Sequence, residues 1–196
     1  MQRRAPYFTS VTSIKLSSPS LSLGILEGMA DTHLSPDRLA LLEQFREAAA
    51  SATSLKALQQ TIVAAAAEKL AHYSWTGFYM LDPIDAEMLV VGPYIGAPTP
   101  HVRIPVSQGI CGAAVASGET VIVDDVGSDP RYLSCSIETK SEIVVPIYAH
   151  GKVVGEIDID SHNPAAFTDD DRTFLEEAAR IVGAYIEAHS DNALTS

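Results

Sequence analysis

Residues 141–161 read SEIVVPIYAHGKVVGEIDIDS and carry the clearest indication of the fold in this chain of 196 residues. The segments 143–148 and 152–159 are rich in β-branched residues, which favour strands. Between them, residues 149–151 read AHG, a short polar stretch with the glycine that tight turns need. The segment therefore predicts an antiparallel β-hairpin.

The second strand of this hairpin carries a row of acids. Side chains alternate along a strand, so Glu156, Asp158 and Asp160 should share one face while Ile157 and Ile159 take the other. Carboxylates two residues apart repel each other, and aspartate is a poor strand former. A solvated outer face would explain the row, and so would a functional site.

Glu142 stands at the head of the apolar run IVVPI in the neighbouring strand. A carboxyl group that is desolvated beside such a run has a raised pKa and can act as an acid. An exposed residue at the start of a strand is the alternative, and position alone leaves both open.

The elements around the hairpin follow from periodicity and capping residues. Ser35, Ser54 and Thr168 are typical N-caps, and Gly118 is a typical C-cap. Together these signals predict a three-layer α/β (α+β) fold with about six strands in a largely antiparallel sheet, flanked by N-terminal and C-terminal helices. The predicted helices are 36–50, 55–70, 109–117 and one from 169 onward; the remaining predicted strands are 75–81, 88–95, 102–106 and 120–123.

The net charge of −12 argues against nucleic acid and anionic membranes as partners. No apolar run approaches the roughly 20 residues that span a bilayer. Two cysteines are too few for a disulfide-based scaffold and fit a reducing compartment, so we expect a cytoplasmic protein.

We expect one domain at 35–190, a tail at 191–196 and an N-terminal extension at 1–34 without ordered structure. The extension is basic and rich in serine, which resembles a transit peptide. Translation starting at Met29 would also explain it.

The two cysteines differ in their predicted surroundings. Cys111 opens a short helix, where free N–H groups favour a thiolate, although a lone cysteine is commonly buried and inert. Cys135 lies in the polar loop RYLSCS, where a thiol is accessible to ligands. Neither has a partner at metal-ligand spacing, so we expect no metal site. Trp75 and Tyr79 share a strand face and would form either core or the wall of a small pocket.

Taken together, these segments resemble the free methionine-(R)-sulfoxide reductases, a family of stand-alone GAF domains. The resemblance covers residues 41–187. The matching motifs are WTGFY at 75–79, GPY at 92–94, VRIP at 102–105, GICG at 109–112, DDV at 124–126, Cys135, SEIVVP at 141–146 and DIDS at 158–161.

The resemblance implies that the chain reduces free methionine (R)-sulfoxide without a cofactor. Cys135 would attack the sulfoxide sulfur, while Glu142 and Asp160 activate the sulfoxide oxygen. A sulfoxide is a poor electrophile until its oxygen is protonated, so an acid beside the thiol is needed. Methionine then leaves, and Cys135 remains as a sulfenic acid.

The resemblance also implies that Asp158 holds the amino acid while Trp75 and Tyr79 pack on its methyl end. The family commonly has a third cysteine before VRIP, where this chain has His101, so Cys111 is the remaining candidate for the resolving thiol. A thioredoxin-type donor and a homodimer are the implied partners. A non-catalytic GAF module that binds a small ligand, or a two-cysteine redox sensor, are the alternatives.

Overall fold

The structure is a computed structural model that describes residues 34–134 and 136–190. Cys135, the tail at 191–196 and the expected extension, apart from its last residue, therefore lie outside the described residues. That last residue, Leu34, is buried against the helix-side core.

Four α-helices and six strands follow one another in the described residues, with a short 3₁₀ helix, Val126–Ser128, after the fourth strand. The elements are α1 (Pro36–Ser51), α2 (Leu55–Lys69), β1 (Trp75–Leu81), β2 (Met88–Ile95), β3 (Arg103–Pro105), α3 (Gly109–Ser117), β4 (Val121–Val123), β5 (Ser141–Ala149), β6 (Lys152–Ser161) and α4 (Asp169–His189).

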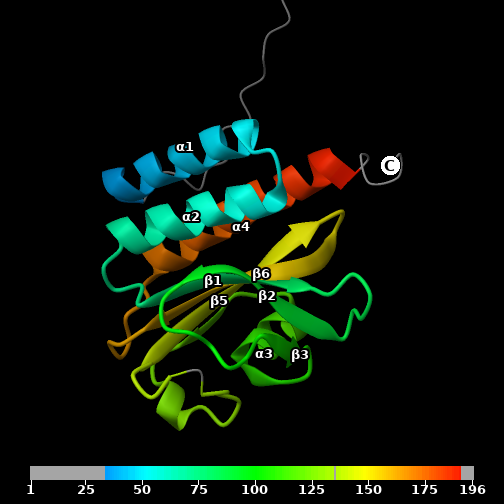
Figure 1. Ribbon diagram of the computed structural model, residues 1–196. Coiled ribbons are helices and arrows are strands. Elements are labelled where there is room, and N and C mark those ends of the chain that lie inside the picture. The colour runs from blue at the N-terminus through cyan, green and yellow to red at the C-terminus, as the bar shows by residue number, and fades with distance from the viewer. Residues whose placement is uncertain (1–33, 135, 191–196) are drawn as a thin grey trace, which may run out of the picture.

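The strands form one sheet in the order β3-β2-β1-β6-β5-β4, and every neighbouring pair is antiparallel. Helices α2 and α4 pack on one face, with α1 lying over them, while α3 lies against the opposite face (Figure 1). The predicted three-layer architecture and six-stranded antiparallel sheet are confirmed.

The hairpin of β5 and β6 is longer than the sequence predicted. The ladder continues beyond the apolar residues, because Glu142 pairs with Asp160 and Ser141 with Ser161. Asp160 therefore continues the strand of the acidic row, and Glu142 lies within β5 and is not a residue that precedes it. In contrast, β3 and β4 are shorter than predicted, with three residues each.

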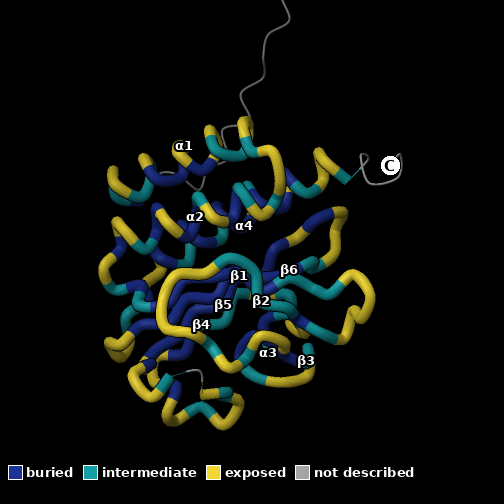
Figure 2. Tube along the Cα trace, in the orientation of Figure 1, coloured by how far each residue is buried: buried dark blue, intermediate teal, exposed yellow. Residues whose placement is uncertain are grey.

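The sheet separates two apolar clusters. Ile157 and Ile159 face the three long helices, and Phe174 of α4 belongs to the same cluster. The smaller cluster on the other face contains Trp75 and Cys111. Figure 2 shows the resulting band of buried backbone along β1, β6 and β5.

Helix α4 lies close to the sheet. A Cβ atom added at Gly183 would collide with the carbonyl oxygen of Tyr148 in β5, so only glycine permits this approach. At the other end, Thr168 and Asp171 form a capping box, in which each side chain binds the backbone N–H of the other residue.

Asp171 also joins α4 to the rest of the helical layer. Its carboxylate accepts hydrogen bonds from Arg38 of α1 and, at 3.0 Å, from the hydroxyl of Tyr73, and it lies 3.1 Å from Nε2 of His72. One carboxylate thus connects three segments that are far apart in the sequence.

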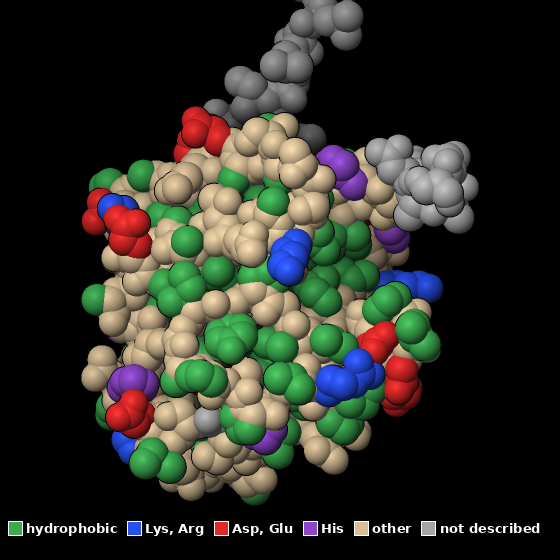
Figure 3. Space-filling view, viewed as in Figure 1, with side chains coloured by type: hydrophobic (Ala, Val, Ile, Leu, Met, Phe, Trp, Pro, Cys, Tyr) green, Lys and Arg blue, Asp and Glu red, His purple; other side chains and the backbone are tan. Residues whose placement is uncertain are grey.

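The Lys and Arg side chains lie apart from one another on the face drawn in Figure 3. Within the described residues, no helix combines the length and apolarity that a membrane span requires.

Candidate active site

The acidic row of β6 lies inside the protein. Glu156 is fully buried, and Asp158 and Asp160 are each 4% exposed. The three side chains point to the face of the sheet that α3 covers, opposite to the face of Ile157 and Ile159. The predicted alternation is confirmed, and the interpretation as a solvated outer face is wrong.

Two further groups complete the cluster from other elements. Glu142 of β5 is paired with Asp160 and is 5% exposed, so it is not the exposed strand end considered above. Cys111 of α3 is 6% exposed and donates a hydrogen bond to Oδ2 of Asp158 at 3.7 Å. One sulfur or carboxyl oxygen atom from each of Cys111, Glu142 and Asp158 lies within 4.8 Å of the corresponding atoms of the other two residues.

Burial raises the pKa of every carboxyl group in this cluster. For Glu142 and Asp158 it is the main cause, and the charges of neighbouring carboxylates raise both pKa values further. The pKa of Asp160 rises to about 7 and that of Glu156 to about 8, again through burial. Near neutral pH the cluster therefore retains protons that exposed carboxyl groups would lose.

The thiol of Cys111 is affected in the same direction. Burial raises its pKa well above the ordinary value, and the charges of Glu156, Asp158 and Glu142 raise it further. A position in the first turn of α3 favours a thiolate, but by only about 0.3–2 kcal/mol. The surroundings of Cys111 thus keep it as a neutral thiol.

The close spacing of Cys111, Glu142 and Asp158 would also suit a bound cation, because thiolate and carboxylate are both metal ligands. A metal ion requires all three groups to be deprotonated. Without a cation, burial and the charges of neighbouring carboxylates raise the pKa values of all three groups.

Aromatic side chains form one wall of the cluster. Trp75 stacks on Tyr79 and on Tyr94, with ring centroids 6.1 Å and 5.2 Å apart. In the β1–β6 register, Trp75 lies opposite Asp160 and Tyr79 opposite Glu156. Trp75 and Tyr79 are therefore buried like core residues and also border the acidic row. The two interpretations from the sequence, core and pocket wall, do not exclude each other.

Hydrogen bonds tie this wall to the loop between β2 and β3. The indole N–H of Trp75 donates to the carbonyl oxygen of Ala97 at 3.2 Å. The hydroxyl of Tyr79 donates to the carbonyl oxygen of His101 at 2.9 Å. The His101 ring in turn places Nε2 3.1 Å from the carbonyl oxygen of Ser134. His101 therefore contacts the residue before Cys135.

A cavity of about 50 Å³ lies at the Asp160 end of the row. It is smaller than an amino acid, so a ligand of that size requires the surrounding side chains to move. Ser136, which follows Cys135 in the chain, contributes to its wall. The other lining residues are Ser74, Trp75, Ala97, Thr99, Thr139, Asp160 and His162.

The structure brings five of the predicted site residues to one face of the sheet: Glu142, Asp158, Asp160, Trp75 and Tyr79. The position of Cys135 falls outside the described residues. Glu156 was not among the predicted site residues, although the alternation along β6 places it in the acidic row. The cavity residue Thr139 was missed because nothing local distinguishes it.

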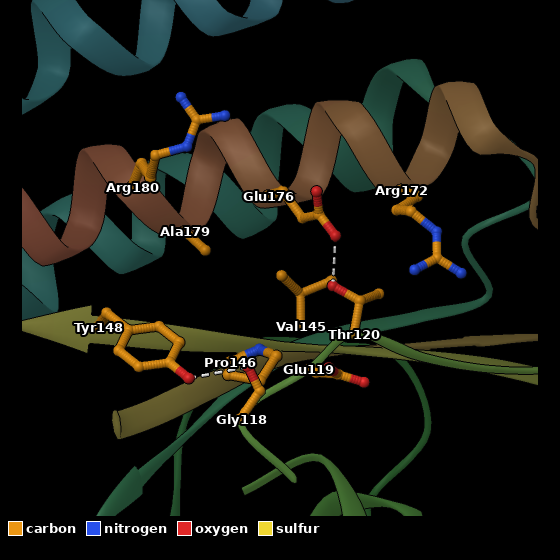
Figure 4. Close-up of a pocket in the computed structure, with 10 residues that line it drawn as sticks. All are labelled: Gly118, Glu119, Thr120, Val145, Pro146, Tyr148, Arg172, Glu176, Ala179 and Arg180. Carbon is orange, nitrogen blue, oxygen red and sulfur yellow. Dashed lines mark hydrogen bonds between the residues drawn. The ribbon is translucent and has the colours of Figure 1, made fainter. Parts of the chain in front are cut away.

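A separate groove of about 580 Å³ opens between α4 and the sheet (Figure 4). It lies on the face of the sheet that α2 and α4 cover, where Val145 points away from the acidic row. Inside it, Thr120 donates a hydrogen bond to Glu176 at 2.6 Å, and Tyr148 donates to the carbonyl oxygen of Gly118 at 2.8 Å. Cys111 does not belong to its lining, and we assign no chemistry to it.

Comparison with known proteins gives a family. The model of the GAF domain matches residues 54–186. The free methionine-R-sulfoxide reductase of Escherichia coli is 35% identical over 137 residues, which are 70% of this chain and 81% of that protein. The enzyme of the same name from Saccharomyces cerevisiae is 40% identical over 110 residues, which are 56% of this chain.

The match spans 61% of the yeast protein and 66% of Bacillus subtilis protein YtsP, which is also 40% identical, so it covers less than two thirds of either relative. Among solved structures, the free methionine-R-sulfoxide reductase from Neisseria meningitidis in complex with its substrate superposes with a TM-score of 0.75. It is 34% identical, and the alignment covers 79% of this chain and 91% of that one.

Proposed function

Because the chain belongs to the GAF domain family, and within it to the free methionine-R-sulfoxide reductases, we propose that it reduces free L-methionine (R)-sulfoxide to methionine. The electrons would come from an external thiol donor of the thioredoxin type. The proposal includes a cytoplasmic location and a homodimer. Light scattering of the purified protein tests whether it is a dimer.

One observation carries the proposal beyond the family likeness. The acids of β5 and β6 are buried, and their raised pKa values keep protons in the site near neutral pH. Protonation of the sulfoxide oxygen makes the sulfur electrophilic, so such a site supplies what this reaction needs. A pocket that only binds an amino acid would not require acids held in their neutral form.

The chemistry assigns different roles to the residues. Cys135 is the nucleophile that attacks the substrate sulfur, and Glu142 and Asp160 donate a proton to the sulfoxide oxygen. The oxygen passes to Cys135, which becomes a sulfenic acid, while the substrate sulfur gains two electrons and leaves as methionine. Each oxidised cysteine thus corresponds to one methionine formed.

The substrate would be held by the remaining members of the cluster. A free amino acid carries an ammonium group, whose positive charge favours the ionised form of Asp158 and is then bound by that carboxylate. Trp75 and Tyr79 offer an apolar surface for the methyl end, and their rings are already stacked on each other. Since the cavity of about 50 Å³ is too small for the substrate, we expect the loop beside Ser136 to move when it binds.

The decisive assay couples thioredoxin, its reductase and NADPH to each diastereomer of free methionine sulfoxide. We expect turnover of the R form only, and loss of at least about 10³-fold in the Cys135→Ser protein, because no other group supplies the nucleophile. Ser134→Ala is the matched control, since the exposed Ser134 contributes only its carbonyl oxygen to the contact with His101.

Absence of turnover with thioredoxin, dithiothreitol and glutathione would contradict the proposal. A methionine-dependent rise in melting temperature without turnover would instead identify a binding module. Reversible oxidation of both cysteines without any effect of methionine sulfoxide would identify a redox sensor.

A further inference from the structure

Cys111 is enclosed by acids and by the packing of α3 on the sheet. The residue is 6% exposed and its thiol donates a hydrogen bond to Oδ2 of Asp158. A carboxyl oxygen of Glu142 lies within 4.8 Å of its sulfur. Asp158 is 47 residues away in the sequence, so this enclosure is a product of the fold.

Glu156 adds a second, independent observation. It is completely buried, and among the described residues no hydrogen bond of normal geometry reaches its carboxyl oxygens. The Cys111 thiol is the only one of these residues that lowers its pKa. Oδ1 of Asp158 is buried and unpartnered in the same way. Of the charged groups around Cys111, Glu156 contributes most to the raised pKa of the thiol.

Formation of a disulfide requires a thiolate, which here would be buried beside three carboxyl groups. None of the ion pairs among the described residues involves Glu142, Asp158 or Glu156, so no cation from such a pair compensates the added charge. The N-terminal turn of α3 is worth about 2 kcal/mol at most, which is less than the cost of burying an unpaired charge.

We propose that Cys111 is not the resolving thiol of this protein, that Glu156 and Asp158 hold it as a neutral thiol, and that an external thiol attacks the Cys135 sulfenic acid directly. This inference rests on the proposed function and specifies its reductant. His101 agrees with it, because it stands where a nearby third cysteine would otherwise provide an internal thiol.

The recycling steps balance without Cys111. An external thiol RSH attacks the sulfur of the Cys135 sulfenic acid, an S–S bond forms, the S–O bond breaks and water leaves. A second thiol, either another molecule or the partner thiol of a dithiol protein, then attacks the mixed disulfide. It releases the Cys135 thiol and leaves the reductant as a disulfide.

The first test uses the unmodified protein without reductant and one equivalent of free methionine (R)-sulfoxide. We expect one methionine per chain, a Cys135 sulfenic acid that dimedone traps, and a Cys111 thiol that can be alkylated after denaturation. Methionine formation together with an intramolecular Cys111–Cys135 disulfide would overturn this inference. If no methionine forms, the proposed function itself has failed.

The second test measures Cys111 alone, by its rate of alkylation in folded Cys135→Ser protein. The rate is measured at pH 9, above the pKa of about 8 of Glu156, where this carboxyl group is ionised. Adding Glu156→Gln keeps the shape of the side chain but removes that charge, so we expect alkylation to become about tenfold faster, the effect of one unit in thiol pKa. Glu43→Gln, on the exposed face of α1, is the matched control. An unchanged rate in the Glu156→Gln protein would show that this carboxyl group does not restrain Cys111.

Discussion

Single residues of this site owe their chemistry to their surroundings. Glu142 and Glu43 have the same side chain, yet one is 5% exposed among other acids and the other lies on the surface of α1. Burial and the charges of Asp158 and Asp160 raise the pKa of Glu142, so it remains a proton donor at a pH where an exposed glutamate is a carboxylate.

Glu142→Gln tests this directly. Glutamine fills nearly the same space but cannot transfer a proton, so we expect methionine release in a single turnover to slow by about 10²–10⁴-fold. Glu43→Gln should leave the rate unchanged. A Glu142→Gln protein with the rate of the parent would remove Glu142 from the proton-transfer step.

At the level of elements, two features build the site. The register of β6 against β1 and β5 brings acids and aromatic rings to one face, and α3 then covers that face. Helix α4 packs on the other face of the sheet. Its N-terminus is secured by the capping box of Thr168 and Asp171.

Removal of this cap should cost stability without affecting the site. We expect Thr168→Ala to lower the free energy of unfolding by about 1 kcal/mol, because the N–H of Asp171 loses its acceptor. Thr173→Ala, within the same helix, should be neutral or slightly stabilising, since alanine has the higher helix propensity. Urea denaturation of both proteins provides the comparison. Equal losses would show that the cap does not contribute.

At the scale of the whole molecule, Asp171 and the buried site acids make the stability depend on pH in opposite directions. Hydrogen bonds from His72 and Thr168, with the charge of Arg38, lower the pKa of Asp171 despite its burial. The protonated form of Asp171 is therefore disfavoured in the folded state. The site acids behave in the opposite way, because for them the folded state disfavours the ionised form.

The stability of the protein should therefore be greatest at mildly acidic pH. The contribution of Asp171 is present above its ordinary pKa of 3.8 and is lost as the pH falls below it. The contribution of the neutral site acids is fully present below their ordinary pKa values of 3.8 for Asp160 and 4.5 for Glu156. It is lost progressively as the pH rises from there, until the loss is complete above about 7 for Asp160 and about 8 for Glu156.

Urea unfolding across this pH range measures the profile. Asp171→Asn should flatten its acid side, and Glu156→Gln should flatten its alkaline side and stabilise the protein above pH 8 or so, where the parent contains an unpartnered carboxylate. A stability that increases steadily into the alkaline range would contradict the assigned pKa directions.

Much of the fold was predictable because its signals are local. The N-caps Ser54 and Thr168 and the C-cap Gly118, with φ of 68°, occur where the sequence predicts them. The strands of the central hairpin were predicted too short at one end, since Glu142 and Asp160 are not strand formers. Their pairing depends on the partner strand and not on their own propensity.

The sequence by itself determined that Glu156, Asp158 and Asp160 share a face, because alternation is a property of the extended backbone. Only the tertiary structure decided that this face is buried, because burial depends on α3, which joins the sheet from more than forty residues away. That burial distinguishes a solvated row of carboxylates from a cluster that keeps its protons. It also places Cys111 among these acids, where its thiol stays protonated.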